Sequence, residues 1–228
     1  EILLFVDADT TLTAGTVAAA VYEMKKRKLD LLTAMPRRIT GCLAERIILP
    51  LIDWSVFAWL PLVAAHKFEN PYLSATFGQF MVFKREAYML IGGHGKIRND
   101  PIDDFGLGRM IKEQGLKWML YDGSDCINVL PYKGNIDTFV GVSRSIFPAM
   151  GFRASIFVPV SAMLFVLGFV PFIILVDNLM FARQINVAFV TSTASVVMIA
   201  MSMLIVYRKF RYNVMTILFY PLLISVIL

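Results

Sequence analysis

The chain changes character along its length: apolar and polar segments alternate at first, and long apolar stretches dominate the last third. Residues 2–6 are apolar without alternation, which predicts a strand buried on both faces, as in a parallel sheet. Strands that alternate with helices predict an α/β domain with a mostly parallel sheet. The pattern predicts further strands at 29–34, 79–83, 117–121 and 126–130, and helices at 16–28, 85–90 and 105–114.

Two apolar stretches without a charged residue, 154–176 and 187–207, follow this domain. As a helix, the first would be about 34 Å long, enough to cross a bilayer core of roughly 30 Å. A third stretch at 214–228 ends short of that length, and the chain starts directly in a strand, so we expect both ends to be cut. We therefore expect a domain at 1–150 and transmembrane helices within 151–228, the last of them incomplete.

Composition and charge also indicate a membrane protein. Hydrophobic residues make up 57% of the chain, and the mean hydropathy is +0.66, too apolar for an ordinary soluble domain. The net charge of +5 does not predict a nucleic-acid partner, because the basic residues form no single patch. The basic group at 208–211 instead predicts a cytoplasmic loop. We expect an integral protein of the plasma (inner) membrane, with domain 1–150 in the cytoplasm.

Residues 47–65 are apolar apart from Asp53 and are interrupted by Pro50 and Pro61. Prolines and aromatic residues in such a stretch favour a pair of helices lying in the headgroup region of the membrane. A buried core helix of the domain is the alternative. A third possibility, a membrane crossing, would place the two acidic clusters described next on opposite faces of the membrane.

Two acidic clusters carry the candidate chemistry. Asp7 and Asp9 come directly after the strand at 2–6, and Asp103 and Asp104 precede the helix at 105–114. Ligands of parallel α/β sheets bind beyond the carboxyl ends of the strands. Carboxylates at such an end suit a hard cation such as Mg²⁺ or Mn²⁺, and the same cation often also binds the phosphates of a substrate. The sequence therefore predicts chemistry on a phosphorylated donor beside a membrane.

The order of five motifs carries a family resemblance. Together they resemble the membrane-bound family 2 glycosyltransferases with a GT-A, Rossmann-like fold, closest to the branch that glycosylates lipids such as carotenoids, hopanoids or ceramide. The resemblance covers residues 1–150 and implies the C-terminal part of a catalytic domain whose first half is absent from the sequence. The motifs are F-V-D-A-D-T at 5–10, G-Q-F-M-V-F-K-R-E-A-Y at 78–88, G-G-H at 92–94, I-D-D-F-G-L-G-R at 102–109 and G-V-S-R at 141–144.

The resemblance implies roles for the four acidic residues. Asp7 would contact the nucleotide side of the donor, and Asp9, with Asp7, would hold the Mg²⁺ or Mn²⁺ that bridges the diphosphate. Asp104 would be the general base that takes a proton from the acceptor hydroxyl. The family has Glu-Asp where this chain has Asp103-Asp104, so the choice of base between these two residues stays open.

The resemblance also implies donor- or acceptor-binding roles for four other residues. Gly78 and Gln79 match the loop that approaches the donor sugar and the acceptor. His94 is expected as a loop residue near the donor, not a metal ligand, because no other His or Cys has ligand spacing to it. Arg144 would hold the diphosphate.

We therefore expect a metal-dependent hexosyltransferase that moves a sugar from a nucleotide diphosphate sugar to a lipid hydroxyl or carboxyl group, with inversion. A processive polysaccharide synthase is one alternative, and the absence of the Q-x-x-R-W motif from the end of the domain disfavours it. A non-catalytic polytopic membrane protein is another. Such a protein would require ionisable residues in its spans, and 154–176 and 187–207 have none.

Overall fold

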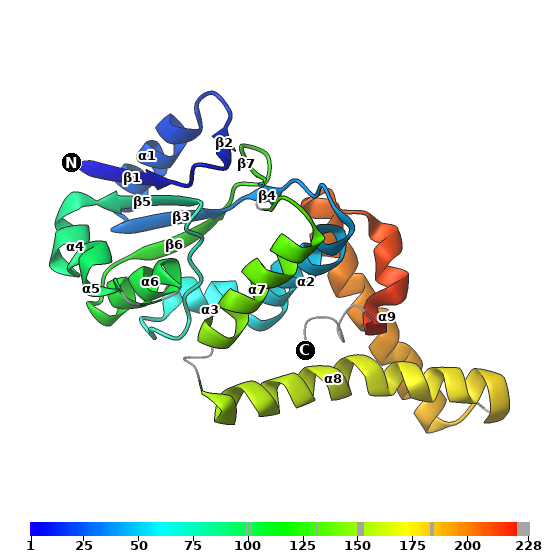
Figure 1. The fold of residues 1–228 in the computed structure, drawn as a ribbon. Coiled ribbons are helices and arrows are strands. Elements are labelled where there is room, and N and C mark those ends of the chain that lie inside the picture. The colour runs from blue at the N-terminus through cyan, green and yellow to red at the C-terminus, as the bar shows by residue number, and fades with distance from the viewer. Residues whose placement is uncertain (99, 101, 131, 150–152, 183–184, 223–228) are drawn as a thin grey trace.

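The structure is a computed structural model that describes residues 1–222 apart from 99, 101, 131, 150–152 and 183–184 (Figure 1). It has an α/β part with two small sheets, and long helices that lie along one side of it. The first sheet has the strand order β1 (Ile2–Val6), β5 (Phe80–Lys84), β3 (Leu31–Met35) and β6 (Trp118–Asp122). The second has the order β2 (Thr10–Leu12), β7 (Ile127–Val129) and β4 (Arg37–Arg38).

Both sheets are mixed, which corrects the expectation of a mostly parallel sheet. β3 pairs with β6, and β4 with β7, in parallel, but β5 is antiparallel to both β1 and β3, and β2 to β7. The reason is the excursion between β3 and β5. It leaves and re-enters the sheet at the same end, where Phe80 pairs with Val6, so the chain must run back in the opposite direction.

The strand at 2–6 is also less buried than its sequence predicts. β1 has β5 as its one paired neighbour in the described sheet, and its Leu4 and Val6 are 38% and 39% exposed. The strands that are buried on both faces are β3 and β5, which lie inside the sheet. A continuous apolar run predicted a strand here, but the number of neighbours decided its burial.

Helices cover the sheet and connect its strands. The expected helices occur as α1 (Thr16–Arg27), α4 (Arg85–Leu90) and α6 (Asp103–Glu113). Two further helices, α5 (Gly93–Lys96) and α7 (Asn135–Ala149), were not predicted. Leu107 and Ile111 of α6 are fully buried against the sheet, and this burial fixes the end of α6 that begins with Asp103.

Residues 47–65 fall in two helices, α2 (Leu43–Trp59) and α3 (Leu62–Lys67). α2 packs against α7 and against the long C-terminal helix α9 (Val187–Lys209). Ile48, Leu49 and Leu51 are buried, and Asp53 is fully buried. The two-helix arrangement agrees with the prediction, but this packed face of α2 is that of the alternative, a core helix.

Two helices are long and apolar enough to cross a membrane by length and composition: α8 (Ala154–Asp177) with its π-helical extension η1 (Asn178–Ala182), and α9. α8 runs along the edge of the molecule, and α9 rises from it towards α2 (Figure 1). The described part of the third apolar stretch begins as a 3₁₀ helix, η2 (Val214–Phe219), not as the expected α-helix. The stretch at 223–228 lies outside the described residues.

The C-terminal end of α9 belongs to the core of the α/β part. Met203 and Tyr207 of α9 and Phe210 after it are buried in the same apolar cluster as the sheet. Two ion pairs join the basic residues of this loop to the sheet side, Lys209 with Asp122 at 2.5 Å and Arg211 with Asp125 at 2.8 Å. The basic loop therefore packs against the α/β part, which also contains the two acidic clusters.

A candidate active-site pocket

A pocket of about 560 Å³ lies between the sheet and α2, where β1 ends and β5 begins. Most of the residues singled out in the sequence line it, although they come from four separate segments of the chain. Asp7 follows β1, Gly78 and Gln79 precede β5, His94 lies on α5, and Asp103 and Asp104 open α6. Leu49, Ile52 and Val56 of α2 form an apolar wall opposite these polar groups.

Asp104 is held by backbone amides on two sides. Its Oδ2 accepts a hydrogen bond from the backbone N–H of Gly78 at 2.9 Å, and its Oδ1 accepts one from the N–H of Phe105 at 2.8 Å. Burial raises the pKa of Asp104 to about 6, with the charges of Asp103 and Asp7 adding to it, although the two amide bonds oppose the shift. A fixed carboxylate with a pKa near the working pH has the properties of a general base.

Gly108 allows α6 to come close enough for this contact. A Cβ at Gly108 would lie 1.9 Å from Oγ1 of Thr76, on the segment that leads to Gly78. With hydrogen in that place, the helix lies directly against this segment, and the contact between Asp104 and Gly78 forms one turn earlier on α6. The helix packing thus places the carboxylate.

The other acidic residues lie close enough to influence one another. Burial raises the pKa of Asp7, and the charges of Asp9 and Asp103 raise it further. Asp9 itself is exposed in the turn before β2 and does not line the pocket. Of the first cluster, Asp7 lines the pocket and Asp9 lies outside it. Both residues of the second cluster, Asp103 and Asp104, line the pocket.

The donor chemistry of Asp7 and Asp9 fits Mg²⁺ or Mn²⁺. Within the described residues, no group of three or more His, Cys, Asp or Glu side chains could hold a metal ion by itself. Mg²⁺, however, usually takes only one or two carboxylates from a protein and completes its shell with phosphates and water. The pKa of Asp7, raised by burial and by Asp9 and Asp103, also reflects a repulsion that a cation would relieve.

His94 is held on α5, which corrects its expected place in a loop. Its Nδ1 lies 2.7 Å from the hydroxyl of Tyr88, and its ring lies 4.9 Å from that of Phe5, centroid to centroid. Its Nε2 is 3.9 Å from Oδ2 of Asp103. His94 thus lies between Phe5 of β1 and Asp103 of α6, and it pairs with no second His or Cys among the described residues.

Gln79 brings an unsatisfied polar atom to the pocket. Its Oε1 is buried and has no hydrogen-bond partner among the described residues. Leaving a buried amide oxygen unpaired costs about 1–3 kcal/mol. A hydroxyl or amide of a ligand in this pocket would satisfy it.

Arg144 does not join the site. It is exposed on α7 and is not among the residues that line the pocket, although Val142 and Ser145 of the same helix are.

Arg38 lines the pocket instead, and sequence reasoning missed it. Its one signal was its position just after the strand at 29–34, the same kind of strand end that singled out Asp7.

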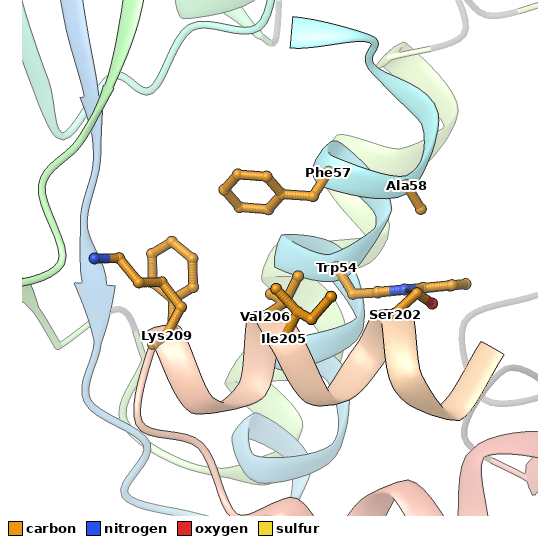
Figure 2. Close-up of a pocket in the computed structure, with 8 residues that line it drawn as sticks. Trp54, Phe57, Ala58, Ser202, Ile205, Val206 and Lys209 are labelled. Carbon is orange, nitrogen blue, oxygen red and sulfur yellow. Dashed lines mark hydrogen bonds between the residues drawn. The ribbon is translucent and has the colours of Figure 1, made fainter. Parts of the chain in front are cut away.

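A second pocket, of about 280 Å³, lies between α2 and α9 and shares no residue with the first (Figure 2). Its walls are mainly apolar, and Trp54 Nε1 donates to Ser202 Oγ across it at 3.0 Å. Lys209 is the one ionisable side chain in its lining. Of these two pockets, the first is the one lined by carboxylates. The lining residues are Trp54, Phe57, Ala58, Ser202, Ile205, Val206, Lys209 and Phe210.

No protein-family model matches this chain, and no curated protein matches it either.

Proposed function

We propose that this protein is a membrane-associated, metal-dependent glycosyltransferase that moves a sugar, with inversion, from a nucleotide diphosphate sugar to a lipid hydroxyl or carboxyl group. The observation that carries this proposal is Asp104. Its carboxylate has a pKa of about 6, raised mainly by burial, and it lies in a pocket with Asp7 and Asp103, in a protein with two helices long and apolar enough to cross a membrane. The family 2 resemblance of the motifs supports the same reaction.

In the proposed reaction, Asp104 accepts the proton of the acceptor hydroxyl as that oxygen attacks the anomeric carbon. The amides of Gly78 and Phe105 hold the carboxylate in place, so little reorganisation is needed at the moment of transfer. Asp103 keeps the pKa of its neighbour high through its charge. Asp7 and Asp9 would hold a Mg²⁺ or Mn²⁺ ion, which neutralises the charge of a leaving diphosphate when bound.

The walls of the pocket support a lipid acceptor. Leu49, Ile52 and Val56 of α2 and Val142 of α7 give the side opposite the carboxylates an apolar surface. α2 also packs against α9, one of the two helices of membrane length. An amphiphile that reaches the pocket along α2 could keep its chain on this surface while its polar end faces Asp104.

The test of the reaction uses the full-length protein in nanodiscs or membranes. We expect sugar transfer from at least one of a panel of radiolabelled UDP-, GDP- and dTDP-hexoses into the organic-extractable fraction, and loss of transfer after EDTA that Mg²⁺ or Mn²⁺ restores. Transfer into material that stays in the aqueous phase as a polymer would favour the processive synthase. No transfer from any donor, with lipid extracts added, would contradict the proposal.

The proposed orientation places the pocket in the cytoplasm, at the plasma (inner) membrane. After replacement of Cys42 and Cys126, a cysteine at Ile185, which is 86% exposed between α8 and α9, should react with an impermeant thiol reagent outside intact cells. A cysteine at Arg208, at the other end of α9, should not react. The reverse labelling would put the pocket on the side where nucleotide sugars are scarce.

A further inference from the structure

Arg38 is the one lysine or arginine among the described residues that line the 560 Å³ pocket. It ends β4, and its side chain is 12% exposed. Its Nη1 donates to Oδ1 of Asp53 on α2 at 2.6 Å, and Asp53 is fully buried. In the part of the chain that the structure describes, this is the one hydrogen bond of the guanidinium, so its other N–H groups remain available to a ligand.

Tyr212 holds Asp53 from the other side. Its hydroxyl donates to Oδ2 of Asp53 at 2.5 Å, so both carboxylate oxygens are engaged, one by Arg38 and one by Tyr212. Burial works to lower the pKa of Arg38, but the charge of Asp53, together with smaller contributions from Tyr212, Tyr132 and Asp104, outweighs it and the pKa is raised. The guanidinium is therefore charged, and Asp53, which accepts its hydrogen bond, is itself held by a residue that follows α9.

Charge balance points to the class of ligand. Asp7, Asp103 and Asp104 bring three carboxylates to the pocket, an environment that repels an anionic substrate. Arg38 and Asp104 line the same pocket, and the charge of Asp104 acts on Arg38. A cation held by Asp7 and Asp9 would offset the repulsion at one edge only. A guanidinium offers a planar fork of donors that matches the oxygens of a phosphate.

We propose that Arg38 binds the phosphate-bearing group of the substrate in this pocket, and that Asp53 and Tyr212 are positioning residues that aim its guanidinium. The inference rests on the proposed function and deepens it. It moves the anion-binding role from Arg144, which lies outside the pocket, to a residue outside the five family-like motifs. It also makes the segment after α9 part of the site, because Tyr212 of that segment bonds Asp53, 159 residues away in the sequence.

The binding test uses the full-length protein and five nucleoside diphosphates, ADP, CDP, GDP, UDP and dTDP, titrated calorimetrically with Mg²⁺. For the nucleotide that wild type binds best, Arg38→Gln should weaken binding about 10-fold or more, because a charge-assisted fork is lost. Arg38→Lys should weaken it less, since it keeps the charge but not the fork. The matched control is Arg37→Gln, the neighbouring arginine on β4 that does not line the pocket, which should stay within about 2-fold of wild type.

Arg38→Gln leaves Asp53 buried without its cation, which can unfold the protein. Arg38→Lys keeps that charge and therefore carries the test if Arg38→Gln does not fold, with thermal unfolding recorded for both. Unchanged nucleotide affinity in folded Arg38→Lys and Arg38→Gln, beside a wild type that binds and transfers sugar, would overturn this inference and leave the proposed function standing. A wild type that binds none of the five nucleotides and transfers no sugar would overturn both.

The positioning role has its own readout. Tyr212→Phe removes the bond to Asp53 and should raise the KM for the donor about 3- to 10-fold, with kcat and the pH midpoint of activity unchanged. Tyr220→Phe is the matched control, because the Tyr220 hydroxyl is buried without a hydrogen-bond partner among the described residues and lies outside the pocket. Equal donor KM values in the two variants would show that Tyr212 is merely structural.

Discussion

The two acidic clusters look alike in sequence and differ in their surroundings. Asp104 is partly buried, is held by two backbone amides, and has its pKa raised to about 6, chiefly by removal from water. Asp9 is exposed in a turn at the outer edge of the pocket. The same side chain thus suits proton transfer at one end of the pocket and cation binding at the other, because the local polarity decides which form of a carboxyl group is stable.

The largest effect should separate the two residues of the second cluster. Asp104→Asn keeps the size of the side chain but cannot accept the acceptor proton, so turnover should fall by roughly 10²–10⁴-fold with donor affinity retained. Asp103→Asn should cost less, because Asp103 acts through the pKa of its neighbour. Side-by-side kcat and donor Kd values test this, with Glu113→Gln at the far end of α6 as control. A larger loss of kcat in Asp103→Asn would make Asp103 the base.

Asp9→Asn should act on metal affinity, and not on the proton-transfer step. We expect the affinity for Mn²⁺ in the presence of a nucleoside diphosphate to fall by about 10- to 100-fold or more. Removing a residue that only hydrogen-bonds a metal ligand already costs about that much. The melting temperature should stay the same, because Asp9 is exposed. Calorimetry that finds the metal-dependent part of donor binding unchanged would remove Asp9 from the metal site.

The pH dependence of turnover should follow the titration of Asp104 in the second cluster. Asp104 must be ionised to accept a proton, and burial, with Asp103 and Asp7, raises its pKa to about 6. Activity should therefore be constant above about pH 7 and fall about 10-fold per unit below pH 6. In Asp103→Asn the midpoint should move to lower pH, because a charge that raised the pKa is gone. An acidic limb that does not move would mean that Asp103 does not influence the titrating group.

The smallest effect concerns the packing that places Asp104. Gly108→Ala puts a methyl group 1.9 Å from Oγ1 of Thr76, so α6 must shift, at a cost of about 1–3 kcal/mol in the free energy of unfolding. The contact between Asp104 and Gly78 should loosen, and kcat should fall with it. Gly95→Ala on α5, where the added atom meets nothing within 4 Å, is the control. Equal unfolding midpoints for the two variants would contradict the close packing of α6.

Local patterns predicted β1, β5 and α6 of the site, because those elements depend on short runs of sequence, but they did not predict β4, α5 or α7. The apolar run at 2–6 predicted β1, and the positions of Asp7 and Asp104 at the ends of elements predicted their place near a pocket. The lengths of the apolar stretches predicted α8 and α9. In each case hydrophobic periodicity or length is enough to specify the structure.

Tertiary structure decided the direction of β5, the exposure of β1 and which arginine lines the pocket. Each depends on which segments meet across long sequence separations, and a local pattern contains no record of that. Arg144 was expected in the site through its motif, yet it is exposed on α7 and does not line the pocket. Arg38 lines the pocket, where its guanidinium is bonded to buried Asp53 on α2, which Tyr212 beyond α9 bonds in turn. A buried charge requires such partners, and only the folded chain can bring them together.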